Sequence, residues 1–115
     1  MKVTDTQTTC FLIEGATRRP GLGVLDPIVV YLTEHDTSRA TLTLQCYGRA
    51  WTCYWGSMGG TFAEFCRRVS AEYMADCLIR GRSGQLRVAS ERHEHPYLAD
   101  ICEAVRGAVA MRAGA

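Results

Sequence analysis

Charge of one sign and long apolar runs are both scarce in this sequence. Its 115 residues carry 13 Lys and Arg against 12 Asp and Glu, a net charge of +1. A mimic of DNA would be strongly acidic, so this balance excludes one, and the overall charge does not favour nucleic acid as a ligand either. No window has the apolar length of a membrane span, and the polar residues 1–9 lack the apolar stretch of a signal peptide. We therefore expect a cytoplasmic protein.

Motifs that mark a metal site or a catalytic centre are missing as well. The six cysteines form no C-x-x-C pair and match no zinc-binding spacing. His93 and His95 form an H-x-H pattern, but no further ligand lies at a recognised spacing. No serine lies in a G-x-S-x-G elbow, and the glycine-rich residues 56–60 lack the Lys-Ser/Thr of a phosphate-binding loop. We expect no catalytic residues, no metal, no cofactor and no enzymatic activity.

The cysteines are also informative about the redox state. Five of the six lie within apolar runs, where a free thiol behaves as a small hydrophobic side chain. Because no export signal is present, a disulfide framework is not expected. We interpret all six as reduced thiols of the core: Cys10, Cys46, Cys53, Cys66, Cys77 and Cys102.

The first half of the chain has the patterns of β-strands. Residues 27–33 are β-branched and apolar, and residues 40–47 and 50–55 alternate between apolar and polar side chains. A period of two is typical of antiparallel strands that bury one face. The dipeptide at 48–49 predicts a hairpin turn between the last two strands. Residues 10–13 predict a further short strand.

The second half changes to a helical period. Thr61 and Glu64 fit a capping box at the start of a helix. Helical structure is predicted over residues 61–80, as two helices with Ser70 as the second N-cap or as one bent helix. Pro96 predicts the first residue of another helix, 96–112, which carries an amphipathic stripe. The charged residues 80–94 are interpreted as a mobile loop, with a short strand at 86–89 as an option.

The order of these elements defines the expected fold. Strands that precede helices favour the α+β class over α/β. We expect a single domain, 1–115, with an antiparallel sheet of three or four strands in residues 10–56. Two or three helices should pack on one face, over side chains such as Leu42, Leu44, Trp51 and Trp55.

The stretch 42–73 resembles a family of small uncharacterised proteins of tailed phages and prophages. Those proteins share a C-Y-G-x-A-W-x-x-Y-W-G-x-M-G core followed by a short helix. The matching residues here are Cys46, Tyr47, Gly48, Ala50, Trp51, Tyr54, Trp55, Gly56, Met58 and Gly59, then Glu64 and Phe65. The resemblance covers about two thirds of the chain and implies a phage or prophage origin, and hence the cytoplasm of a bacterial host. It implies no mechanism.

Three tyrosines are the first candidates for a binding surface. Strand parity places Tyr31, Tyr47 and Tyr54 on the polar face of the sheet, among threonines. Tyrosine offers a large contact area with little rotamer entropy to lose, so such a face suits a protein partner. The same face could stack nucleic-acid bases. The alternative is that the tyrosines only form cross-strand pairs that stabilise the sheet.

The arginines are the second candidates. The basic side chains are nearly all Arg, which binds carboxylates and phosphates through two parallel hydrogen bonds, although a GC-rich genome would also explain the bias. We expect several of them to gather between the second and third helices, where they could contact phosphate or an acidic protein. The alternative is a solvated loop with weak ion pairs. The candidates are Arg67, Arg68, Arg80, Arg82 and Arg87.

Together these features suggest a non-enzymatic phage protein. Such proteins often bind host machinery, so the expected partner is a host protein complex, foremost a bacterial defence system such as a CRISPR effector. The alternative is a nucleic-acid-binding accessory protein of phage recombination or replication. Steep weakening of binding with salt would indicate the latter.

Overall fold

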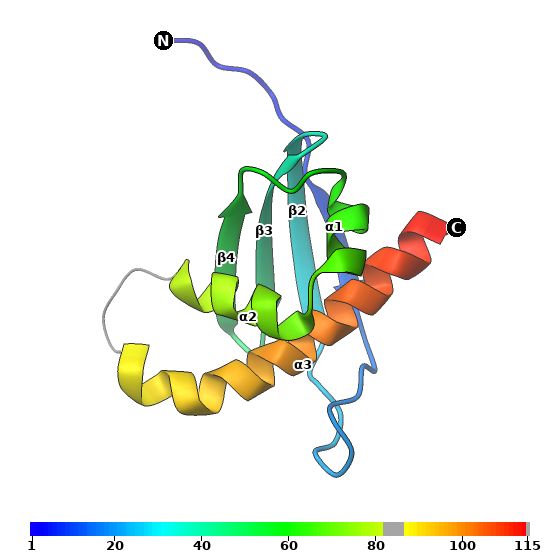
Figure 1. The fold of residues 1–115 in the computed structure, drawn as a ribbon, viewed down its shortest axis with the longest axis vertical. Coiled ribbons are helices and arrows are strands. Elements are labelled where there is room, and N and C mark those ends of the chain that lie inside the picture. Colours follow the sequence, from blue (N-terminus) through cyan, green and yellow to red (C-terminus); the bar gives the residue numbers. More distant parts are fainter. Residues whose placement is uncertain (82–86, 115) are drawn as a thin grey trace.

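Four strands precede three helices in the chain (Figure 1). The computed structural model describes the backbone of residues 1–81 and 87–114, and the side chains of residues 1–81 and 94–114. The α+β prediction is confirmed, with one antiparallel four-stranded sheet in the order β1-β2-β3-β4. The elements are β1 (Thr9–Ile13), β2 (Ile28–Asp36), β3 (Arg39–Cys46), β4 (Arg49–Trp55), α1 (Phe62–Arg68), α2 (Ala71–Arg80) and α3 (Arg87–Gly114).

The three helices lie on one face of the sheet (Figure 1). The strand alternation predicted which face this is, and the prediction is confirmed. Trp51 is 1% exposed and Trp55 is 7% exposed, and Leu42 and Leu44 are fully buried. Burial of apolar side chains in this layer, which forms one continuous cluster, is the main stabilising contribution to the fold.

The hairpin between β3 and β4 differs from the prediction by one residue. Cys46 pairs with Arg49, so the two-residue turn consists of Tyr47 and Gly48, not of Gly48 and Arg49. Both turn residues have positive φ, 56° for Tyr47 and 74° for Gly48, as a type I′ turn requires. Tyr47 is therefore a turn residue. The alternation of side chains had predicted, wrongly, that it continues the strand.

Helices α1 and α2 are separate, with a break at Val69 and Ser70. The predicted capping box is present: the Thr61 hydroxyl accepts from the Glu64 amide at 3.2 Å, and the Thr61 amide donates to Glu64 at 3.0 Å. Ser70 is the N-cap of α2, and its Oγ accepts from the Tyr73 amide. Each hydroxyl satisfies a backbone donor that a helix start leaves without a partner.

The start of α3 was wrongly predicted. The helix begins at Arg87, and Pro96 lies inside it instead of at its first position. Residues 87–89 are helical, so the strand option at 86–89 is wrong there, and a loop continuing to residue 94 is also wrong; residues 82–86 lie outside the described residues. Tertiary contacts hold the upstream turns. Trp51 Nε1 donates to buried Glu94 at 2.6 Å, and His95 Nε2 lies 2.8 Å from Asp76 of α2.

The cysteines are free, but they are not all core residues. Cys46, Cys66, Cys77 and Cys102 are buried and Cys53 is half-buried. Cys10 is exposed, because strand parity places it on the face of the sheet that no helix covers. The interpretation of Cys10 as a core thiol was therefore wrong. Among the described residues, no helix is long and apolar enough to cross a bilayer.

Candidate partner-binding surface

The face of the sheet opposite the helices is open and almost free of charge. We call it the open face, and it comprises the outward side chains of the four paired strands. In the described part of the chain, its outward charged residues are Asp36 and Arg39 at one end, which form an ion pair of 2.6 Å, and Arg49 borders it at the hairpin end. The Ser38 amide and Arg39 hold the pKa of Asp36 below its ordinary value. The other open-face residues include Cys10, Leu12, Val29, Tyr31, Thr33, His35, Thr41, Thr43, Gln45, Ala50, Thr52 and Tyr54.

Polar side chains on the open face satisfy one another across the strands. The Thr43 and Thr52 hydroxyls lie 2.9 Å apart, and His35 Nε2 lies 2.8 Å from the Thr41 hydroxyl. Tyr31 donates its hydroxyl hydrogen to Gln45 at 3.3 Å. These pairs fix the side chains in place without a ligand, so the surface is ordered before a partner arrives.

Two of the three predicted tyrosines lie on this face. Tyr31 is half-buried near its centre, whereas Tyr54 on β4 is 55% exposed. Gly56 makes room for the Tyr54 ring, because a Cβ at that position would meet the ring at 3.1 Å. The third tyrosine, Tyr47, projects from the hairpin turn and is 77% exposed.

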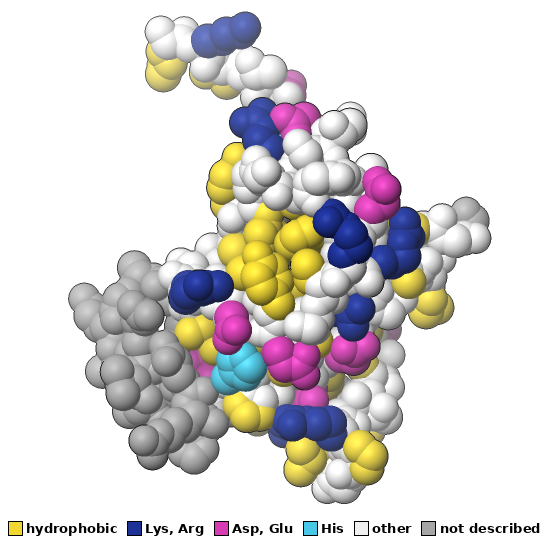
Figure 2. All heavy atoms as spheres, viewed as in Figure 1, with side chains coloured by type: hydrophobic (Ala, Val, Ile, Leu, Met, Phe, Trp, Pro, Cys, Tyr) yellow, Lys and Arg dark blue, Asp and Glu magenta, His cyan; other side chains and the backbone are white. Residues whose placement is uncertain are grey.

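The predicted arginines whose side chains are described lie in helices and do not form a loop between the second and third helices. Arg67 and Arg68 lie in the last turn of α1, and Arg80 ends α2. Arg68 donates to the Met58 carbonyl, so it holds the strand-to-helix turn in place. Arg82 and the side chain of Arg87 lie outside the described residues. The helix side shows Arg, Asp and Glu side chains around a central hydrophobic area (Figure 2).

One groove brings together two predicted residues from different parts of the chain. It measures about 480 Å³, lies at the β4 edge, and is lined by both Tyr54 and Arg80. Arg80 donates to the Asp76 carbonyl at 3.4 Å and lies 3.8 Å from the Cys77 sulfur. The other lining residues are Thr41, Thr52, Cys53, Trp55, Cys77 and Gly81. The groove therefore continues the open face past the β4 edge as far as the Arg80 guanidinium.

Gly81 determines how closely α2 approaches this edge. A Cβ at Gly81 would lie 2.1 Å from the Thr52 carbonyl oxygen, which no real Cβ can do. Only glycine lets the end of the helix contact the β4 backbone directly. This contact also covers part of an edge strand, which would otherwise offer its backbone for pairing with another chain.

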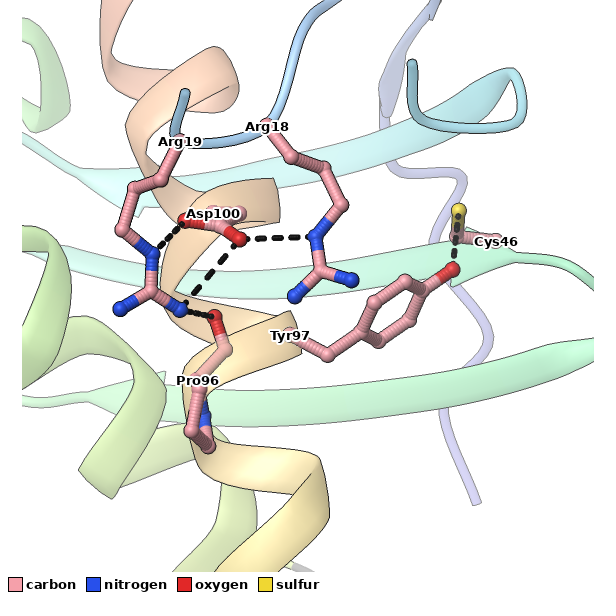
Figure 3. Close-up of polar contacts among 6 residues, drawn as sticks. All are labelled: Arg18, Arg19, Cys46, Pro96, Tyr97 and Asp100. Carbon is pink, nitrogen blue, oxygen red and sulfur yellow. Dashed lines mark hydrogen bonds and ion pairs between the residues drawn. The ribbon is translucent and has the colours of Figure 1, made fainter. Parts of the chain in front are cut away.

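A second polar cluster was not predicted from the sequence. Asp100 on α3 is 8% exposed and accepts from Arg18 Nε at 2.8 Å and from Arg19 Nε at 2.9 Å (Figure 3). Arg19 also donates to the Pro96 carbonyl at 3.2 Å. The cluster joins the loop of residues 15–23 to the last helix. About eighty residues of sequence separate the partners, so no local pattern could have indicated the contact.

Tyr97 completes this cluster. The Arg18 guanidinium carbon lies 5.1 Å from the centre of the Tyr97 ring, and the Tyr97 hydroxyl is 3.3 Å from the Cys46 sulfur (Figure 3). Burial, followed by the bond to Cys46, raises the pKa of Tyr97 to about 12. The hydroxyl thus stays neutral at physiological pH and acts as a structural donor.

In the described residues, no group of three or more His, Cys, Asp and Glu is arranged to hold a metal ion. Of the H-x-H pattern, His95 contacts Asp76, and the side chain of His93 lies outside the described residues.

Comparison with known proteins identifies the family. The chain matches the phage protein family Phage_phiTE_072 over residues 1–107. The match covers most of the sequence, so the chain belongs to this phage family, and the resemblance to small phage proteins is confirmed at that level. No curated protein and no solved structure shows significant similarity to the chain.

Proposed function

We propose that this member of a phage family is a non-enzymatic protein that binds and inhibits a host protein complex in the bacterial cytoplasm. The proposed target is a defence system, foremost a CRISPR effector. The observation that carries the proposal is the ordered, nearly uncharged open face, which ends in the groove shared by Tyr54 and Arg80.

The composition of this surface supports a protein partner. The centres of protein interfaces are depleted of charged residues and enriched in tyrosine and arginine. Tyr54 presents a half-exposed ring, and Arg80 lines the same groove; these are residue types on which binding energy concentrates. The cross-strand hydrogen bonds lower the entropy lost on binding, because the side chains are already ordered.

The alternative, a nucleic-acid-binding accessory protein, has less support on this surface. Phosphate contacts by Lys and Arg supply most of the affinity of such proteins. On the open face as described, Asp36 already neutralises Arg39, and the other cations, Arg49 and Arg80, lie at its edges. Bases could stack on Tyr31 and Tyr54, but in the described residues no Lys or Arg without an ion-pair partner lies near both rings to bind the phosphates.

Phage plating on an immune host tests the proposal. The chain is expressed in bacteria whose CRISPR system targets an infecting phage, and plaques are counted. We expect wild type to restore plating and Tyr54→Ala to reduce the restoration tenfold or more, since loss of a tyrosine on which binding energy concentrates costs about 2 kcal/mol. The control is Met111→Ala, which truncates an exposed apolar side chain near the end of α3, away from the groove, and should restore plating as wild type does.

The outcomes separate the candidates. Failure of wild type to restore plating in any of a panel of defence-proficient hosts would reject the inhibitory function. Equal loss with Tyr54→Ala and Met111→Ala would reject the open face as its site. Binding to a DNA or RNA oligonucleotide that weakens steeply between about 50 and 200 mM salt would instead support the accessory role.

A further inference from the structure

A second groove lies at the opposite end of β4 from the groove of Tyr54 and Arg80. It measures about 490 Å³, within the range of small-ligand pockets, and is formed by the loop of residues 15–26, the hairpin turn and α3. Its aliphatic lining comes from Leu22, Val24 and Leu25, and its aromatic lining from Tyr47 and Tyr97. Arg18, Arg49 and Asp26 complete it.

Arg18 is held in position before any ligand binds. Asp100 accepts from its Nε, and its guanidinium lies over the Tyr97 ring (Figure 3). In the described part of the chain, its two terminal nitrogens donate no hydrogen bond. An arginine fixed through Nε keeps its terminal nitrogens for a planar carboxylate, which can accept from both.

Arg49 gives the groove a further positive charge. It is exposed, and its side chain forms no ion pair or hydrogen bond within the described residues. Together with the ion pairs that Asp100 forms, the groove has three guanidiniums, of Arg18, Arg19 and Arg49, against two carboxylates, of Asp26 and Asp100. The groove thus complements a ligand that carries a negative charge.

Tyr47 occupies its place in the groove at the expense of backbone strain. Its φ of 56° lies in the left-handed region, which favours Gly, Asn and Asp and is rare for aromatic residues. Its ring is 77% exposed, so burial in the core does not compensate for the strain. Strain at an exposed residue beside a groove is typical of binding sites.

We propose that this groove binds a peptide segment of a partner in which a large apolar side chain lies next to a carboxylate. The apolar side chain packs between Tyr47 and the aliphatic wall, and Arg18 and Arg49 bind the carboxylate. Arg18 lies over the Tyr97 ring, so a nucleotide base would have only Tyr47 to stack on, whereas the aliphatic wall favours a large apolar side chain. The groove is separate from the one containing Tyr54 and Arg80, and its occupancy does not depend on the identity of the host complex.

Small-molecule probes test this by amide chemical-shift titration of the full chain. N-acetyltryptophan carries both a large apolar side chain and a carboxylate. N-acetyltryptophan amide lacks the carboxylate, and N-acetylglycine lacks the large side chain. Thymidine monophosphate represents a nucleotide. We expect N-acetyltryptophan to shift the amides of Leu25 and Gly48 saturably, with a dissociation constant of about 0.1–10 mM. The other three should bind at least fivefold more weakly.

Variants assign the binding to the groove. Arg49→Gln and Tyr47→Asn should each weaken N-acetyltryptophan binding at least fivefold, whereas Arg39→Gln at the other end of the sheet should not. Tyr47→Asn should also melt at an equal or higher temperature, because asparagine suits positive φ. Arg49→Gln leaves the turn residues intact, so it remains informative if Tyr47→Asn is less stable.

The proposal is overturned if no saturable shift occurs, if the amide binds as tightly as the acid, or if Arg49→Gln changes nothing. Tighter binding of thymidine monophosphate would assign the groove to nucleotides and would also overturn it. None of these results involves the host complex, so they are distinguishable from failure of the plating assay.

Discussion

The two faces of the sheet use the same strands but differ in what they do with aromatic side chains. On β4, Trp51 and Trp55 point under the helices and are almost fully buried, while Tyr54 between them points outward and is 55% exposed. The covered face gains stability from apolar burial. The open face gains little from its aromatic side chains, so it is the part of the sheet that remains for a partner.

The largest effect that this comparison predicts is at Trp51. Trp51→Ala should destabilise the fold by about 3–5 kcal/mol, which is much of the stability of a small domain. The truncation also removes the indole donor from buried Glu94, so the upstream turns of α3 should loosen. Urea unfolding followed by circular dichroism measures the loss.

The matched change on the other face is Tyr54→Ala. Because the Tyr54 ring is largely exposed, its loss should cost less than about 1 kcal/mol in the same unfolding experiment. If both variants unfold at similar urea concentrations, the inference is wrong that the covered face supplies the stability and the open face is left for binding.

Thiol reactivity gives the next largest difference between the faces. Burial raises the pKa of Cys53 to about 12, so very little of this thiol is ionised near neutral pH. Burial likewise raises the pKa of Cys66 to about 12 and also raises that of Cys102. Cys10 on the open face is exposed. A thiol reagent at about pH 8 should therefore modify one cysteine rapidly.

Cys10→Ser is the control for this labelling. It should abolish the rapid phase and leave the slow phases unchanged. Several rapid thiols in the wild type would mean that the covered face opens readily to solvent.

A smaller effect is expected where α2 meets the β4 edge. Gly81→Ala places a methyl group on the Thr52 carbonyl oxygen, so the helix must move away, at a cost of about 1–3 kcal/mol. Gly107→Ala is the matched control in α3, where a Cβ meets nothing within 4 Å. It should stabilise the protein by up to about 1 kcal/mol, because alanine favours helix. Equal thermal shifts in both variants would show that the close contact at the edge is not formed.

The smallest effect concerns the solvent-exposed start of α1. Hydrogen bonds from the Thr61 amide and hydroxyl lower the pKa of Glu64 below 4.5. The contribution of the Glu64 carboxylate to stability is therefore complete above pH 4.5, and it is lost as the pH falls through the lower pKa of the folded state. Glu64→Gln keeps the capping geometry without a titrating group. Thermal melts from about pH 6 to pH 3 should show a slightly smaller stability loss for the variant.

Local patterns predicted much of the sheet and the first two helices. The alternation of Trp51, Thr52, Cys53, Tyr54 and Trp55 fixed the faces, because successive side chains of a strand point in opposite directions. The capping residues Thr61 and Ser70 marked two helix starts, because their hydroxyls satisfy nearby amides.

Other features depended on contacts that local patterns do not contain. Pro96 is a normal first helical residue, yet α3 begins upstream of it, where Glu94 and His95 contact β4 and α2. Tyr47 continued the alternation of its strand, but the type I′ turn displaced it from the open face. For the candidate surface, the sequence indicated Tyr31 and Tyr54 correctly as open-face residues but did not indicate the groove that joins Tyr54 to Arg80.

The sequence by itself determined the order of the elements and the division of each strand into an inner and an outer set of side chains. These follow from backbone geometry and local hydrogen bonding, which act over a few residues. Only the tertiary structure decided which distant residues come together: Arg18 bonds to Asp100, Trp51 bonds to Glu94, and Arg80 and Tyr54 line one groove. Such contacts form when buried surfaces pack together, and packing depends on the whole chain at once.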